Sequence, residues 1–458
     1  MSAWYRELKP IWPLAPLAFI VLLLGYAGYW PALPFVAKRT KGAHENATPA
    51  EPLFVEWLVK QDSAEEPTAS PIDVTHFSVA SLDSETTGRE NSEAWDAVTR
   101  PQVTRVGDNL FCLWQSHTSL GGVTAIKIFG SWSLDGTNWT PPEVVFSVSG
   151  MSSRAKDGVL NSASFLSIDD QVYAVAAIYE TIGYANNDST NVSESLSAEP
   201  TAEYPRGVRE LLGYVTRRLG PDRSMGNCIE LIRWLDGASS DSATLISDPV
   251  DQGLISDIVE RLATPDSRFG GKMDFPELEL ETEDRYRLSN PTQVTLPEDR
   301  ILRLWGSDQG LDRLYGQISH DNGLTWDKPF PTNIRQNGLN AALGTLPNGP
   351  VFLAGNQLRT KRGFGTPLTV SIAFDDLKFA ECFELLRDVP ERQHAKNPTL
   401  PAELLRNVGF QVGSCLIDGE WLLISYSVNA EKIQLSRVRA QDLAPAVTEK
   451  PKVDDETR

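Results

Sequence analysis

Apolar and polar positions follow a regular pattern along most of the chain. From about residue 100 onward, short apolar runs such as QVTRV, LFCLW, ILRLWGS and EWLLISYS are separated by Gly-Asp, Asp-Asp, Asn-Gly or Asp-Gly pairs. Short runs rich in aromatic and β-branched residues, divided by turn residues, are typical of all-β proteins. The pattern therefore predicts an all-β fold for this part of the chain.

The apolar runs recur in five units of roughly 40–60 residues, and each unit holds three or four predicted strands. The units begin near Pro101, Val159, Pro291, Leu339 and Gly413. Repeated units of strands joined by tight turns are the sequence form of propeller blades. Together with a strand at residues 73–82 that would complete the ring, they predict a β-propeller of five or six blades, and we expect six.

The N-terminal segment differs from the rest of the chain, because residues 11–37 contain no charged side chain. A helix of about 20 residues crosses the hydrocarbon layer of a membrane. Trp and Tyr residues flank this segment at both ends, as in the aromatic belts of membrane helices. A cleaved signal peptide is the alternative, since Arg6 and Lys9 precede the apolar run. The length of the run and the lack of a small-x-small cleavage site favour an uncleaved single-pass anchor.

The remaining segments have the composition of linkers and loops. Residues 1–10 form an N-terminal tail, and residues 38–98 form a flexible linker rich in Ala, Glu, Ser, Thr and Pro that includes the predicted strand at 73–82. The propeller covers residues 99–442, with loop insertions at 184–205 and 238–288. Residues 443–458 are expected to be a disordered tail.

Charge and cysteine content narrow the range of partners. The net charge of −19 argues against a nucleic acid as a broad partner, although a few local arginines can still hold an anionic ligand. None of the four cysteines has the spacing of a metal site, and Cys112 and Cys415 lie in apolar runs that predict small buried side chains. One disulfide remains open if the domain lies outside the cytoplasm. No cofactor and no metal is predicted.

Two short motifs predict a particular kind of turn. In SHDNGLTW the defining positions are Ser319, Asp321, Gly323 and Trp326; in the shorter SLDGTNW they are Ser133, Asp135, Gly136 and Trp139. Asp and Ser side chains can accept hydrogen bonds from the backbone of a tight hairpin, Gly supplies a positive φ, and Trp covers the turn. A third, degenerate copy lies at residues 373–379. Each motif is therefore expected to form a stabilised hairpin turn.

These motifs, together with NAALGTLPNG, TPLTVSIAFDD and GFQVGSCLIDGEWLLISYSVN, resemble the BNR-repeat or Asp-box sialidase-like proteins of bacteria. The resemblance covers roughly residues 100 to 440. It implies a sialidase-type propeller in which the two Asp-box turns are structural and lie away from the substrate face. It also implies that the propeller is extracytoplasmic, a point that the charges on either side of residues 11–37 do not decide.

The resemblance implies a carboxylate clamp of three arginines, which suits the planar, bidentate geometry of guanidinium groups. Arg100 matches the first position because it precedes a proline at the opening of a blade, although a solvated loop arginine is an equal alternative. Arg313 matches the second position, ahead of an Asp-box. The third position is occupied by Gly365, so Arg362 or Arg359 would have to take its place.

The catalytic residues of the family are not found at the matching positions. The loop QSHTSLGGVTAIK has no carboxylate to act as the acid, and Asn290 and Pro291 replace the activating Glu. Val412 and Gly413 occupy the place of the nucleophilic Tyr, and Tyr426 is expected to be a core or pore-lining aromatic residue. No catalytic residue is therefore assigned.

Two functions remain open at this point. The first is a membrane-anchored, sialidase-like propeller that binds a glycan or glycoconjugate, or a degenerate glycosidase, without the Tyr, Glu and Asp of the catalytic set. The alternative is an active exo-sialidase-like glycoside hydrolase that acts on an anionic sugar. The missing residues favour the first, and family resemblance alone would name the second.

Overall fold

The computed structural model separates the chain into Met1–Pro52 and Leu53–Arg458, and all residues that it describes lie in the second unit. The described residues are 55–59, 72–81, 97–120, 123–147, 159–181, 209–232, 244–245, 254, 257–258, 288–307, 313–338, 340–358, 365–374, 377–391 and 409–444. The predicted anchor at 11–37, the insertion at 184–205, most of the insertion at 238–288, and residues 359–364 with Arg359 and Arg362 lie outside them. Within the described ranges no helix is both long enough and apolar enough to span a bilayer.

The described residues form five β-sheets and one short helix, α5 (Ala440–Leu443). The first sheet contains β3 (Ala97–Val106), β4 (Asn109–Leu120), β5 (Val123–Ser133) and β6 (Glu143–Ser147). The second contains β7 (Val159–Ile168), β8 (Gln171–Thr181), β9 (Arg209–Leu219), β10 (Met225–Ile232) and β11 (Thr244–Leu245). The third contains β12 (Leu288–Leu296), β13 (Arg300–Ser307), β14 (Arg313–Ser319) and β15 (Phe330–Arg335).

The last two sheets each gain a strand from the N-terminal side of the chain. The fourth sheet contains β16 (Ala342–Thr345), β17 (Val351–Gly355), β18 (Leu368–Ala373) and β19 (Lys378–Leu386), with β1 (Glu56–Trp57) at its edge. The fifth contains β20 (Phe410–Asp418), β21 (Trp421–Val428) and β22 (Lys432–Arg439), with β2 (Thr75–Ser81) at its edge. The five repeated units of the sequence are therefore five sheets.

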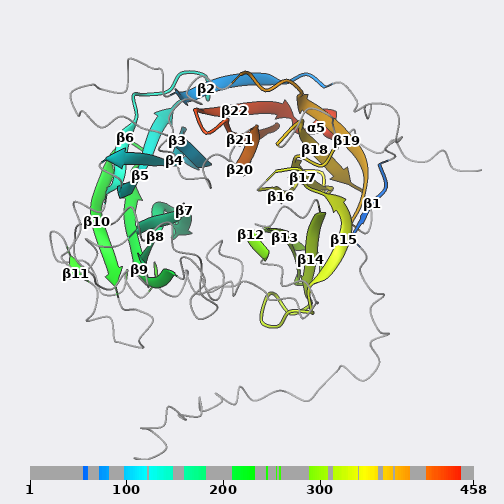
Figure 1. Cartoon of the computed structure of the whole chain (residues 1–458), viewed down its shortest axis with the longest axis horizontal. Coiled ribbons are helices and arrows are strands. Elements are labelled where there is room, and N and C mark those ends of the chain that lie inside the picture. The colour runs from blue at the N-terminus through cyan, green and yellow to red at the C-terminus, as the bar shows by residue number, and fades with distance from the viewer. Residues whose placement is uncertain are drawn as a thin grey trace, which may run out of the picture. The chain divides into compact units, whose positions relative to one another are not determined.

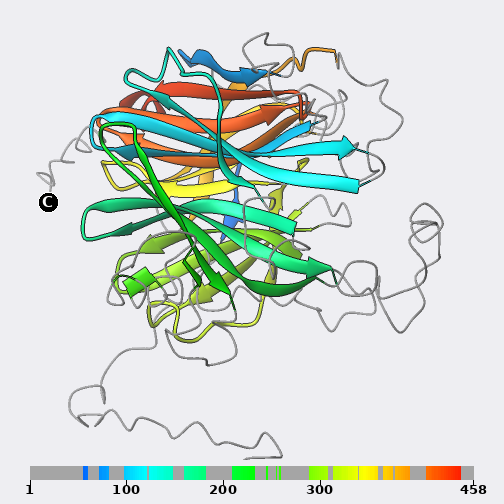
Figure 2. The ribbon, with the colours of Figure 1, turned by 90° about the vertical axis from the view of Figure 1, so that its left-hand side faces the viewer.

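Within the unit Leu53–Arg458 the sheets are arranged around a centre, in the manner of a propeller (Figure 1). The first strand of each sheet is innermost: β20 packs against β3 and β16, β12 against β16, and β7 against β3. In the turned view of Figure 2 the first and fifth sheets, cyan and red, lie next to each other. The core consists of apolar clusters between neighbouring sheets, such as the cluster of Leu368, Val370, Leu422 and Ile424 between the fourth and the fifth.

The two ends of the sheets differ in their connections. At one end, which we call the turn end, tight turns join the first and second strands and also the third and fourth strands of a sheet. Hydrogen bonds link neighbouring sheets there, for example Asn109 Nδ2 to Pro221 O at 2.7 Å and Asn348 Nδ2 to Ala444 O at 2.8 Å. The opposite end, where the inner strands begin, is called the loop end.

The strand predicted at residues 73–82 is present as β2, which pairs antiparallel with β22 from Thr75–Arg437 to Ser81–Lys432. An N-terminal strand thus completes a sheet built from the C-terminal part of the chain. The residues that the structure describes form five sheets, and the expectation of six blades stays a prediction. β2 is the fourth strand of the fifth sheet and does not begin a separate blade.

The linker prediction for residues 38–98 is corrected at Glu56 and Trp57, which form β1. Glu56 N donates to Leu377 O and Leu58 N donates to Phe379 O, so β1 runs parallel to β19. On its other edge the side-chain amide of Asn333 binds both Trp57 N (2.7 Å) and Trp57 O (3.0 Å). The Trp57 ring is buried in the cluster between the third and fourth sheets. The run LFVEWLV at residues 53–59 is apolar except for Glu56, but the Ala, Glu, Ser, Thr and Pro residues on both sides of it give the whole segment the composition of a linker.

Replacement of Trp57 by Ala should destabilise the fold by about 3 kcal/mol, because a large aromatic side chain leaves the core. Leu58→Ala is the matched control: the Leu58 side chain is 45% exposed, and its loss should change stability by less than about 0.5 kcal/mol. The measurement is the denaturant midpoint of the full chain. Equal midpoints for the two variants would show that β1 contributes nothing to the core.

Candidate functional site

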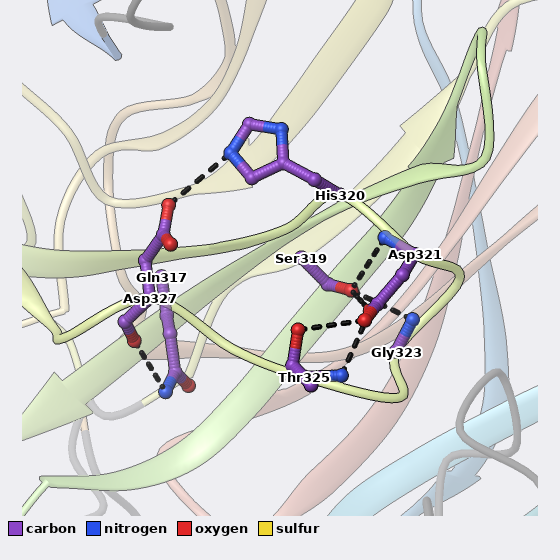
Figure 3. A network of polar contacts seen from close by, with 7 residues as sticks. All are labelled: Gln317, Ser319, His320, Asp321, Gly323, Thr325 and Asp327. Atoms are coloured by element: carbon purple, nitrogen blue, oxygen red, sulfur yellow. Dashed lines mark hydrogen bonds and ion pairs between the residues drawn. The ribbon is translucent and has the colours of Figure 1, made fainter. Parts of the chain in front are cut away.

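The motif at Ser319–Trp326 forms a hydrogen-bonded turn between β14 and β15 (Figure 3). Ser319 Oγ accepts a hydrogen bond from Gly323 N at 2.7 Å and donates one to Asp321 Oδ1 at 2.9 Å. The Asp321 carboxylate also accepts from Thr325 N at 2.7 Å and Thr325 Oγ1 at 2.6 Å. Trp326 Nε1 donates to Gly323 O, and Gly323 has a φ of +85°. These contacts are the ones that the sequence predicts for the motif.

The underside of this turn is held by a buried arginine. The Arg303 guanidinium lies 3.8 Å from the centre of the Trp326 ring, and its Nε and Nη2 donate to Gln293 Oε1. Burial lowers the Arg303 pKa to about 10, so the group stays charged at neutral pH. The tryptophan of the motif therefore joins the turn to the sheet through a cation–π contact.

The motif at Ser133–Trp139 forms the same kind of turn between β5 and β6. Asp135 Oδ1 accepts from Thr137 N at 2.8 Å and Asn138 N at 2.9 Å, and Gly136 N donates to Ser133 Oγ at 2.9 Å. Trp139 Nε1 donates to Gly136 O, and the φ of Gly136 is +73°. Both motifs lie at the turn end, away from the start of the inner strands.

The aspartates of both motifs are ionised and stabilise their turns by accepting hydrogen bonds. Hydrogen bonds from the backbone of Asn138 and Thr137 hold the pKa of Asp135 below its ordinary value. The Thr325 hydroxyl and backbone N–H lower the pKa of Asp321 in the same way. A carboxyl group that acts as a catalytic acid needs the opposite shift, toward the working pH. Neither aspartate is arranged for acid catalysis.

The contribution of Asp321 to stability should depend on pH. Because its pKa is lower in the folded chain than in the unfolded chain, the stabilisation is complete above the unfolded value of about 3.9 and decreases as the pH falls further. Asp321→Ala should therefore be less stable than wild type at pH 7, and the difference should shrink at about pH 3. Asp327→Ala, which removes a carboxylate facing exposed His320, is the control. A pH-independent difference for Asp321→Ala would contradict this stabilising role.

Four of the five inner strands break their pairing register near the loop end. The breaks lie between Thr99 and Gln102 in β3, Asn161 and Ser164 in β7, Ser289 and Thr292 in β12, and Val412 and Ser414 in β20. β-Bulges of this kind are frequent next to functional sites, because they redirect a side chain. Their recurrence around one centre makes the loop end of the inner strands the candidate functional site.

Arg100 lies in the bulge of β3, immediately before Pro101. Its φ is +53°, a left-handed conformation that is uncommon for a residue with a side chain, and the residue is half-buried. Strained backbone of this kind persists only where the surroundings impose it. The structure therefore places Arg100 at the centre of the candidate site in a fixed backbone conformation.

Arg313 begins β14 and its side chain is exposed at the loop end. Its direct partner across the strand pair is Arg335, the last residue of β15. Like charges directly opposite each other in a sheet are destabilising. Within the described residues neither guanidinium has a hydrogen bond or an ion pair. Arg335 was missed by the sequence analysis, because only the register of the hairpin shows that it faces Arg313.

The predicted arginines come from different sheets. Arg100 belongs to the first sheet and Arg313 to the third, whose places around the centre are separated by the fourth and fifth sheets on one side. Arg362 and its alternative Arg359 lie outside the described residues. The clamp of three arginines therefore remains a prediction.

A buried polar network holds the residues that precede and follow the segment 359–364. Gln336 Oε1 accepts from Gln357 Nε2 at 2.9 Å, and Thr369 Oγ1 donates to Gln357 Oε1 at 2.8 Å. Asn356 Nδ2 donates to Pro367 O at 2.9 Å, next to the cis peptide bond Thr366–Pro367. Buried hydrogen bonds of this kind restrict the side chains that make them, although Asn356 Oδ1 has no hydrogen-bond partner among the described residues. They give the loop end of the fourth sheet a defined geometry.

Gly413, at one of the two positions that the sequence resemblance assigns to the nucleophile, lies in the bulge of β20. A Cβ atom at Gly413 would lie 1.7 Å from Pro101 O, so the backbone of β3 fills the space of any side chain. The adjacent Val412 is fully buried in the core. Neither position can present a tyrosine hydroxyl to a ligand.

Tyr426 does not replace the missing nucleophile. Its ring is fully buried and packs edge-on against Phe410 at a centroid distance of 5.9 Å, as expected for a core aromatic residue. Ser436 Oγ donates to its hydroxyl at 3.1 Å, and burial raises its pKa above the ordinary value. The hydroxyl therefore stays protonated, and it also contacts His76 Nδ1 at 3.4 Å. The complete burial of Tyr426 keeps this hydroxyl away from a ligand.

Gly413→Ala tests the close contact at the centre. The added methyl group would overlap the backbone of Pro101, so we expect a loss of about 3 kcal/mol in stability. Gly419→Ala at the other end of β20 is the control: it has open space but a φ of +59°, so it should cost only about 1 kcal/mol. Denaturant unfolding of both variants measures the difference. A Gly413→Ala variant as stable as Gly419→Ala would disprove the contact.

The described residues offer no group of three or more His, Cys, Asp or Glu side chains arranged to hold a metal ion. All four cysteines are free thiols, and Cys112 and Cys382 are buried. Burial raises the pKa of Cys382 to about 11. The buried environment predicted for Cys112 is confirmed. Cys415, for which the same environment was predicted, is only partly buried.

Comparison with solved structures identifies the fold. A structure described as a sialidase matches 84% of this chain at 18% identity with a TM-score of 0.57, and the match covers 35% of the sialidase. The chain has a sialidase-like fold. It spans about a third of the length of that sialidase, so the activity of the longer protein is not carried over.

Two further sialidase structures are similar at lower scores. A Trypanosoma rangeli sialidase in complex with sialic acid has 11% identity and a TM-score of 0.42, with 81% of this chain and 60% of that chain covered. A leech intramolecular trans-sialidase has 9% identity and a TM-score of 0.43, with 78% and 70% covered. No family model and no curated protein matches the sequence.

Proposed function

We propose that this protein is a sialidase-like propeller that binds an anionic glycan or glycoconjugate at the loop end without hydrolysing it. The observation that carries the proposal is Gly413. The position that the family resemblance gives to the nucleophilic tyrosine has no room for a side chain, because Pro101 O lies there. A double displacement on a sugar needs a nucleophile at that place.

The arginines at the loop end support an anionic ligand. Arg313 and Arg335 face each other without a carboxylate partner among the described residues, and Arg100 is held at the central bulge. Guanidinium groups bind carboxylates through two parallel hydrogen bonds. The net charge of −19 makes the lack of an ion pair at Arg313 and Arg335 notable, since acidic side chains are abundant elsewhere on the chain.

The finer features of the proposal come from the sequence. We propose that the turns at Ser133 and Ser319 are Asp-box repeats, that residues 11–37 anchor the protein in a membrane by a single span, and that the propeller is extracytoplasmic. A surface-held binding module of this kind would concentrate glycoconjugates next to the membrane. No cofactor enters the proposed function.

The test combines a glycan array with a turnover assay on the purified full-length chain. We expect binding to acidic glycans such as sialosides, weaker binding at high salt, and no release of fluorophore from a fluorogenic sialoside. Arg313→Gln should weaken binding about tenfold, because it removes a charge-assisted hydrogen bond. Arg300→Gln, which removes one positive charge at the turn end, is the control and should bind as wild type does.

Two outcomes would contradict this proposal. Turnover of the sialoside that disappears in Arg313→Gln would favour the alternative, an active glycoside hydrolase on an anionic sugar. Binding to neutral glycans with equal affinity in wild type and Arg313→Gln would show that the arginines at the loop end do not select the ligand.

A further inference from the structure

A second group of arginines lies at the turn end of the fifth sheet. The Arg437 guanidinium is 4.6 Å from the centre of the Trp421 ring and 5.3 Å from that of Phe77. The Arg439 guanidinium is 5.1 Å from the same Trp421 ring. We call these four residues the Trp421 cluster. It is built on three adjacent strands, β21, β22 and β2.

The pairing register explains why the cluster forms. Arg439 lies opposite Trp421, and Arg437 lies between Leu423 on β21 and Thr75 on β2. Side chains two residues apart on a strand share a face, so both arginines continue the row of Ile433 and Leu435. That row is apolar where the fifth sheet packs against the first sheet. The row changes from aliphatic to cationic at the turn end.

Neither guanidinium has a polar partner in the part of the chain that the structure describes. Arg437 Nε is buried and makes no hydrogen bond. No ion pair involves Arg437 or Arg439. Buried donors in native structures are almost always paired, so an unpaired one calls for an explanation such as an unoccupied ligand site.

Two acidic side chains of this region are engaged by other groups. Asp418, at the end of β20, accepts two hydrogen bonds from the Arg105 guanidinium on β3. The carboxylate of Asp135 is occupied by the backbone of its own turn, which approaches β22 where Gly136 meets Leu435. Among the described residues, neither arginine of the cluster therefore forms an ion pair, although the net charge of the chain is −19.

The geometry of the stack determines which ligand chemistry fits. A guanidinium that lies against an aromatic ring uses its face for this contact, and its N–H groups remain available at the edge. Both guanidiniums contact the Trp421 ring, so the ligand that suits both has several acceptor oxygens and two negative charges. A single neutral hydroxyl could satisfy only one donor edge and would leave the repulsion between the arginines.

We propose that the Trp421 cluster binds a doubly charged oxyanion, a phosphate or sulfate group, at the turn end of the fifth sheet. This site is separate from the loop end, since β22 runs from Lys432 at the loop end to Arg439 at the turn end. The group bridges the edges of Arg437 and Arg439, and Trp421 holds both side chains in place. The proposal does not depend on glycan binding by Arg313.

The test is calorimetric titration of the full-length chain with inorganic phosphate and with inorganic sulfate at constant ionic strength, with chloride as the reference anion. We expect one saturable site with a millimolar or tighter dissociation constant. Arg439→Gln should weaken binding at least tenfold, and Arg437→Gln should do the same if the variant folds. Arg439 is exposed, so its variant keeps the test valid even where Arg437→Gln is unstable.

The controls separate this site from nonspecific charge effects and from the loop end. Arg300→Gln removes one charge at the turn end of the third sheet, and Arg313→Gln removes one at the loop end; both should bind phosphate as wild type does. Preference for phosphate or for sulfate would identify the source of the group. Absence of saturable binding, or equal affinity in wild type and Arg439→Gln, would overturn the proposal.

Discussion

The close approach of β20 to β3 is the constraint on which the rest of the structure depends. At Gly413 the two inner strands are so near that Pro101 O occupies the position of a side chain. The contact is reinforced by Gln102 Nε2, which donates to Gly413 O, and by Ser425 Oγ, which donates to Pro101 O. This contact, called the seam below, joins the fifth sheet to the first sheet. It can form only because position 413 has no Cβ atom.

The same seam determines the chemistry at the centre. The bulge that brings Pro101 against Gly413 also contains Arg100 in its left-handed conformation. The sialidase-like fold alone does not determine the chemistry at this centre, because a fold supplies positions and function depends on the side chains at them.

The sequence predicts those parts of the structure that depend on local patterns. The turn at Ser319, the strand β2 and the five repeated units are visible in the sequence because turn residues and alternation carry the signal. The strand at Trp57 is not predicted, since a two-residue strand shows no periodicity and its pairing depends on Asn333 and β19, which are far away in the chain. Arg335 is hidden as well, because facing Arg313 is a property of the hairpin register.

Two groups of arginines lie at opposite ends of the sheets, although the net charge of the chain is negative. Arg313 and Arg335 oppose each other at the loop end, and Arg437 and Arg439 share Trp421 at the turn end. In each group like charges are neighbours on paired or single strands, an arrangement that costs stability unless an anion compensates it. The chain has 61 acidic residues, yet none of those described forms an ion pair with these arginines. Their absence from the described contacts at both ends is the reason to look for ligands there.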